Sequence, residues 1–97
     1  MSQRLKILTM DSRFEKLNEQ LQQLEWPSVY YFKFIAPNEP KTIALVTSLF
    51  SSDSDINMRP SRKGNYTSIN IKEVMVSAAA VIEIYEEAAK IKGVISL

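Results

Sequence analysis

Two runs of alternating apolar and polar residues, separated by a short turn, constrain the fold of this chain more than any other feature. The runs cover residues 56–61 and 67–72. A period of two is typical of antiparallel β-strands with one dry face and one wet face. Gly64 and Asn65, in the connection between the runs, tolerate positive φ and so predict a hairpin turn. Pro60 cannot donate a ladder hydrogen bond, which places the first strand at a sheet edge.

The patterns on either side of this hairpin predict the rest of the fold. The predicted elements are a strand at 29–36, a helix that begins near Pro40, the hairpin, a helix from Ala78 capped by Ser77, and a strand at 94–97 after Gly93. This order indicates an α+β domain of the ferredoxin-like βαββαβ type. Its four-stranded antiparallel sheet would carry two helices on one face and leave the other face polar and open.

An additional amphipathic helix precedes these elements. Ser12 and Glu15 have the spacing of a capping box, and Trp26-Pro27 is expected to close the helix. Its apolar stripe comprises Phe14, Leu17, Leu21 and Leu24. We expect residues 1–10 to form a flexible arm and residues 11–97 to form one ferredoxin-like, ACT-like domain.

The composition limits the chemistry that the chain can perform. Among 97 residues there is no cysteine and no histidine, which excludes thiol nucleophiles, imidazole bases and the common zinc ligands. We therefore expect no catalytic residues, no metal site and no cofactor. No stretch has the length of a membrane span, and the short apolar run at the N-terminus does not fit a signal peptide, so a cytoplasmic setting is the expectation.

The hairpin tip is the first candidate binding site. Its residues are Arg59, Arg62, Lys63, Gly64, Asn65 and Tyr66. The cations and the backbone amides of Gly64 and Asn65 could bind an anion, such as a phosphate, a carboxylate or an acidic partner. The simpler interpretation favours a turn in which Gly64 and Asn65 supply the geometry and the cations protect an edge strand from aggregation.

The open sheet face is the second candidate site. Its predicted residues are Tyr31, Lys33, Ser68, Asn70 and Lys72. RNA-recognition domains share this fold and stack bases on aromatic residues of the same face, so a nucleic-acid-binding module is the alternative function. The net charge of +1 and the few aromatic residues on this face argue against nucleic acid as the main partner.

Three segments resemble the YbeD-like proteins, a family of small bacterial proteins of unassigned function. The segments are PSRKGNYTSINI at 60–71, IEIYEEAAKIKGVISL at 82–97 and LNEQLQQLEWP at 17–27. The resemblance implies a fold close to that of ACT domains, which bind small regulatory ligands, often amino acids, at dimer interfaces. Some family members are associated with lipoate-synthesis genes, which suggests a regulatory role.

One junction departs from the family pattern. The family and the ACT domains tend to carry a glycine where the first strand leads into the first helix of the sheet, and here that junction reads Ile35-Ala36-Pro37-Asn38. A Cβ and a proline ring would hinder the close approach of a ligand to this backbone. The expected function is a non-enzymatic regulatory or interaction module that forms a homodimer and binds a small ligand or a protein partner.

Overall fold

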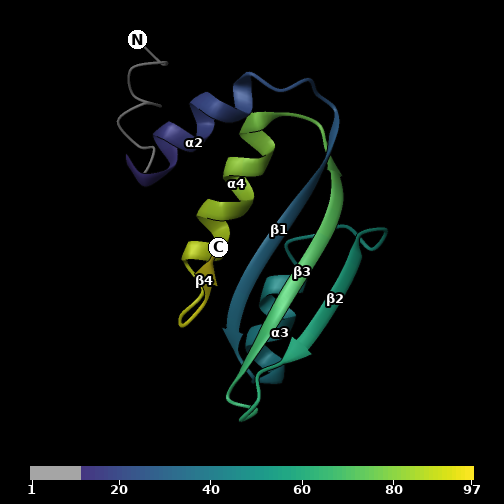
Figure 1. The fold of residues 1–97 in the computed structure, drawn as a ribbon, viewed down its shortest axis with the longest axis vertical. Coiled ribbons are helices and arrows are strands. Elements are labelled where there is room, and N and C mark those ends of the chain that lie inside the picture. Colours follow the sequence, from purple (N-terminus) through teal and green to yellow (C-terminus); the bar gives the residue numbers. More distant parts are fainter. Residues whose placement is uncertain (1–11) are drawn as a thin grey trace.

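The computed structural model describes residues 12–97 of the chain. In chain order the elements are α2 (Ser12–Gln22), β1 (Ser28–Pro37), α3 (Pro40–Thr47), β2 (Asp55–Pro60), β3 (Tyr66–Met75), α4 (Ala78–Ala89) and β4 (Ile95–Ser96). Figure 1 shows a twisted sheet with α3 behind its lower part and α4 beside β1. The predicted arm, residues 1–10, lies outside the described residues.

The four strands form one antiparallel sheet in the order β2-β3-β1-β4. β1 and β3 are paired along their whole length, from Ser28 opposite Met75 to Pro37 opposite Tyr66. β4 pairs with β1 only at Phe34 and Ile35. The element order and the sheet order are those of the ferredoxin-like fold, so the predicted fold class is confirmed.

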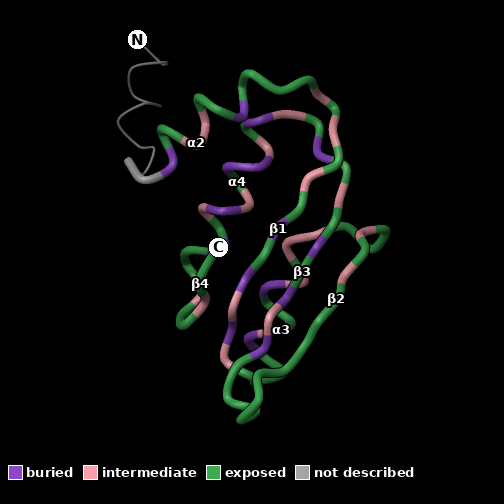
Figure 2. The backbone as a smooth tube through the Cα atoms, in the orientation of Figure 1, coloured by how far each residue is buried: buried purple, intermediate pink, exposed green. Residues whose placement is uncertain are grey.

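The hydrophobic core lies on one face of this sheet. Phe32 and Phe34 of β1 are at most 1% exposed, and burial alternates along β1 and β3 as a period of two requires (Figure 2). The Phe32 ring lies 5.4 Å from that of Tyr85 on α4 and 5.0 Å from that of Phe50, just after α3. Both helical segments therefore pack on the same face of the sheet, as the sequence predicted.

The additional helix α2 packs against α4, but it is shorter than predicted. Phe14 and Leu21 are buried, and the Phe14 ring stacks on Tyr85 with the ring centroids 6.1 Å apart. Leu24, which we expected in the buried stripe, is 52% exposed, so that prediction is wrong. The helix ends at Gln22, after which the Trp26 indole N–H donates to the Leu21 carbonyl at 2.9 Å. The predicted capping box involves the Ser12 side chain, which lies outside the described side chains.

Candidate functional site: the open sheet face and its surroundings

The face of the sheet away from the helices brings together all the predicted open-face residues. Tyr31 lies opposite Lys72, Lys33 opposite Asn70, and Ser68 opposite Ile35. Directly opposed residues of an antiparallel pair project to the same side, so these side chains share one surface. We call this surface the open face: Val29, Tyr31, Lys33 and Ile35 of β1, Asp55, Asn57 and Arg59 of β2, Tyr66, Ser68, Asn70, Lys72 and Val74 of β3, and Ile95 of β4.

The open face is polar only in its centre, which corrects the prediction of a polar face. At one end Val29 lies opposite Val74, and Tyr31 is the next open-face residue of β1. Their exposed fractions are 47%, 62% and 70% respectively. We call these three residues the apolar end. The sequence prediction missed it because the alternation was read in the hairpin, where the wet positions are polar, whereas Val29 and Val74 lie outside those two runs.

The two tyrosines of the open face lie far apart. Tyr31 lies opposite Lys72, while Tyr66 lies opposite Pro37, six positions further along β1. At a rise of ~3.3 Å per residue the two side chains start ~20 Å from each other. Neighbouring bases of a bound single strand could not stack on both of them at once.

The hairpin tip is a backbone-closed turn. The Gly64 N–H donates to the Ser61 carbonyl at 2.9 Å, and the Ser61 N–H donates to the Tyr66 carbonyl at 2.7 Å. Gly64 has a φ of 77°, as the predicted turn requires. The Gly64 amide that an anion site would use is thus already bonded within the turn.

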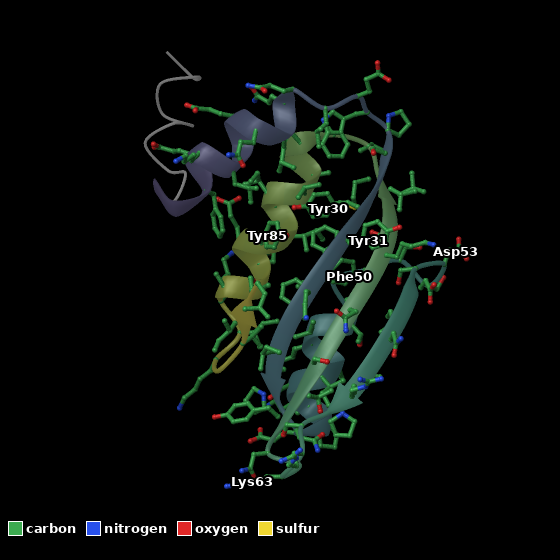
Figure 3. The ribbon with its side chains drawn as sticks, viewed as in Figure 1. Tyr30, Tyr31, Phe50, Asp53, Lys63 and Tyr85 are labelled. Atoms are coloured by element: carbon green, nitrogen blue, oxygen red, sulfur yellow. The ribbon has the colours of Figure 1, made fainter. Side chains whose placement is uncertain are left out.

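The six predicted hairpin residues divide into two groups. Arg59 and Tyr66 belong to the open face, whereas Arg62, Lys63, Gly64 and Asn65 are exposed residues of the tip. Figure 3 shows Lys63 at the end of the hairpin. Within residues 12–97 neither Arg62 nor Lys63 has a carboxylate within ion-pair distance. Their charges are available to a partner, and neither residue lines any of the three cavities described below.

Asn38 is a residue whose structural role the sequence analysis missed. Its side-chain amide donates to the Gly64 carbonyl at 2.9 Å and its backbone N–H donates to the Asn65 carbonyl at 3.0 Å. Its side-chain oxygen accepts from the Thr67 hydroxyl at 2.9 Å. One asparagine thus ties the end of β1 to the base of the hairpin. An asparagine after a strand and before a proline-led helix reads only as a turn, so the sequence carried no signal for this long-range contact.

The junction that departs from the family pattern is filled by a close packing contact. A Cβ on Gly93, which has a φ of 84°, would lie 2.8 Å from the Pro37 Cγ. A cavity of about 460 Å³ lies beside this contact, lined in part by Glu39, Lys41 and Lys92. The Pro37 ring packs against Gly93 at the end of β1, and the predicted hindrance to a ligand at this junction stays a prediction.

A second cavity, also of about 460 Å³, adjoins the apolar end and contains carboxylates. Asp53, Asp55 and Glu73 line it together with Lys72. Glu73 accepts a hydrogen bond from the Ser51 N–H at 2.8 Å, so it holds the loop before β2 in place. Within residues 12–97 no group of three acidic, histidine or cysteine side chains could hold a metal ion.

The third cavity, of about 590 Å³, lies among α2, α4, β1 and β4. Its lining is mainly apolar, from Phe14, Leu17, Tyr30, Tyr85, Ala89, Val94, Ile95, Ser96 and Leu97. Two phenol groups meet in its wall, with Tyr30 Oη and Tyr85 Oη 3.1 Å apart (Figure 3). Burial, and secondly the hydrogen bond to Tyr30, raise the pKa of Tyr85 well above its ordinary value of 10.0.

The comparisons with known proteins identify the family. A family model described as "Protein of unknown function (DUF493)" matches residues 22–97. The chain belongs to the DUF493 family. The YbeD-like proteins are members of the same family, so the resemblance in the sequence is confirmed. No curated protein and no solved structure matches this chain.

The match to DUF493 covers the whole sheet of this protein. It runs from the last residue of α2 through all four strands, and so includes the open face, the hairpin and the Pro37–Gly93 contact. In the part of this DUF493 protein that the structure describes, no helix is both long enough and apolar enough to cross a membrane.

Proposed function

We propose that this DUF493 protein is a non-enzymatic interaction module with a regulatory role, and that it forms a homodimer through its open face. The observation that carries the proposal is the apolar end, where three large side chains stand exposed on a sheet face that no helix within residues 12–97 covers. Contiguous exposed apolar side chains are typical of interaction surfaces rather than of free monomer surfaces.

The charges on the open face favour a particular arrangement of two copies. Its centre carries the cations Lys33, Lys72 and Arg59 against one carboxylate, that of Asp55. A symmetric contact matches each patch with the same patch of the other copy, so like charges at its middle would repel. A two-fold axis at the apolar end brings Val29, Val74 and their counterparts together and leaves Lys33 and Arg59 further from the axis. Lys72, in the row beside the apolar end, lies opposite the carboxylate residue Asp55.

The residue inventory supports a role without catalysis. The chain has no histidine or cysteine. Of the serines in the loop before β2, Ser54 donates to a backbone carbonyl at 2.7 Å and Ser51 accepts the Asp53 N–H at 3.0 Å. These hydroxyls cap a loop through bonds to the backbone, and the chain has no imidazole to activate either of them.

A regulatory signal would act on this dimer through differential binding. The exposed cations of the hairpin tip could bind an anionic ligand or an acidic partner more tightly in one assembly state than in the other. The alternative, a nucleic-acid-binding module on the same face, has less support because Tyr31 and Tyr66 are separated by ~20 Å and cannot form one stacking platform.

The test is the oligomeric state of a charge variant. Light scattering on the wild-type protein should give the mass of a dimer, and Val74→Asp should give that of a monomer because it buries a charge in the contact. Val74 is 62% exposed in the single chain, so thermal unfolding of the variant monomer should be little affected.

The matched control is Asn57→Asp, which adds the same charge in the polar centre of the open face. It should leave the dimer intact. A wild-type protein that stays monomeric at high concentration would contradict the proposal. A salt-sensitive shift of single-stranded RNA by the wild type, lost in Lys33→Glu, would support the alternative instead.

A further inference from the structure

The outer edge of β1 is only partly covered by β4. The Leu97 N–H donates to the Lys33 carbonyl at 2.9 Å, so the backbone groups of Lys33 point toward the β4 side. In an antiparallel strand these directions alternate, so the N–H and C=O of Tyr31 and Val29 point to the same side. Among residues 12–97 none of these four backbone groups has a hydrogen-bond partner on that side.

This unpaired edge lies next to the third cavity, which reaches β1 at Tyr30, between Val29 and Tyr31. The cavity of about 590 Å³ is lined there by Tyr30 of β1, by residues of α2 and α4, and by the segment 94–97. Tyr30, whose side chain points to the helix side of β1, forms one wall together with Tyr85 (Figure 3). Unpaired strand backbone beside an apolar groove is the arrangement in which an added strand is bound in β-augmentation.

We propose that this edge binds an extended peptide of a partner protein, which adds to the sheet beyond β4 and runs antiparallel to β1. The backbone requires an extended occupant, because only a strand can satisfy the outward N–H and C=O groups of both Val29 and Tyr31. The backbone edge is distinct from the dimer contact in the proposed function, which uses side chains of the open face; the two share only the side chain of Tyr31.

The residues around this edge determine which side chains the bound peptide can carry. Peptide residues opposite Phe32 and Tyr30 would point into the groove and meet Leu17, Tyr85 and Ala89, so apolar residues fit there. Of the two hydroxyl hydrogens of the Tyr30–Tyr85 pair, only one is used between them. The other can donate to an acceptor on the peptide.

The peptide residues between these two positions would point to the open face. They would contact the Tyr31 side chain directly and approach Lys33, which has no ion-pair partner among residues 12–97. Lys72, opposite Tyr31 on the far side of β1, adds a second cation. Charge complementarity therefore selects a peptide in which apolar residues alternate with carboxylates.

The test uses capped peptides of alternating isoleucine with glutamate, and of alternating isoleucine with lysine. The glutamate peptide should bind saturably, and by the charge argument at least ~5-fold more tightly than the lysine peptide. Hydrogen exchange should show the amides of Val29 and Tyr31 slowed by the glutamate peptide. The amides of Tyr30 and Phe32, which face β3, should be slow with or without it.

Two variants of one residue separate the backbone from the side chain. Val29→Pro removes an outward N–H that has no partner in the free protein, and should weaken peptide binding about 10-fold or more. Val29→Ala keeps that N–H and should bind with an affinity within about 3-fold of the wild type. Val74→Asp, which breaks the proposed dimer contact, should still bind the peptide, so the two proposals can fail independently.

Three outcomes would overturn the inference. The first is equal binding of the glutamate and lysine peptides or no saturable binding of either. The second is equal peptide affinity of Val29→Pro and Val29→Ala, with exchange at Val29 and Tyr31 unchanged by peptide. The third is protection of those two amides in the free protein that disappears on dilution, which would assign the edge to a second copy of the chain.

Discussion

At the scale of single residues, two glycines occupy the same backbone region for different reasons. Gly64 and Gly93 have φ of 77° and 84°. A Cβ on Gly64 would meet nothing within 4 Å, whereas one on Gly93 would lie 2.8 Å from the Pro37 Cγ. The first glycine is required by its turn alone, and the second also by the packing of the C-terminal turn on the end of β1.

This difference predicts unequal effects of the same substitution. Gly64→Ala should lower the free energy of unfolding by ~1 kcal/mol, the cost of placing a Cβ in the left-handed region. Gly93→Ala should cost ~2–3 kcal/mol, because a clash with a rigid proline ring is added to the same backbone term. Chemical denaturation of both variants measures the difference. In a Pro37→Ala background the two substitutions should lower the free energy of unfolding by similar amounts. If the difference between them is unchanged, the contact with Pro37 does not cause that difference.

At the scale of elements, the two helices of the ferredoxin-like unit begin in different ways. Ser77 before α4 accepts the Ala80 N–H through its hydroxyl at 3.1 Å. Glu39 before α3 makes no side-chain cap to the helix backbone, and Pro40 follows it as the first helical residue. Because proline lacks an N–H and has a helical φ, α3 depends less on a side-chain cap than α4 does.

The two helix starts should therefore respond differently to alanine. Ser77→Ala should lower the free energy of unfolding by ~1 kcal/mol. Ser77→Asp should keep most of the stabilisation that the cap provides, because aspartate is also a good capping residue. Glu39→Ala should cost less than ~0.5 kcal/mol, since only a long contact with the Thr42 hydroxyl at 3.4 Å is lost. Urea titrations of the three variants test this order. A larger loss for Glu39→Ala than for Ser77→Ala would contradict it.

The sequence predicted elements best where one local pattern decided them. The hairpin and the Ser77 cap were both visible in short windows, and the structure contains each of them. Leu24 was misplaced because an apolar residue at helical spacing does not show where a helix ends. The apolar end and the unpaired edge of β1 depend on strand register and on the length of β4, which no local window contains.

At the scale of the whole molecule, an aromatic cluster connects the additional helix to the sheet. Tyr85 of α4 lies 6.1 Å from Phe14 of α2 and 5.4 Å from Phe32 of β1, measured between ring centroids. Tyr85 is 6% exposed, and its hydroxyl bonds only to that of Tyr30 among residues 12–97. Ionisation of this one side chain would place a charge where three elements meet.

Alkaline pH should therefore destabilise the protein in a way that depends on Tyr85. Its pKa in the folded protein lies above the ordinary 10.0, chiefly because burial disfavours the phenolate. Above about pH 10 the unfolded chain loses this proton before the folded chain does, so the free energy of unfolding falls as the pH rises. In denaturant titrations between pH 10 and about 11.5, the free energy of unfolding of Tyr85→Phe should fall less steeply with pH than that of the wild type. The lost hydrogen bond should make this variant ~1 kcal/mol less stable at pH 7.

Tyr31→Phe is the matched control. Its free energy of unfolding should fall with pH as steeply as that of the wild type, since it retains Tyr85. If Tyr85→Phe and the wild type lose stability in parallel above pH 10, the phenol is not held neutral by the fold.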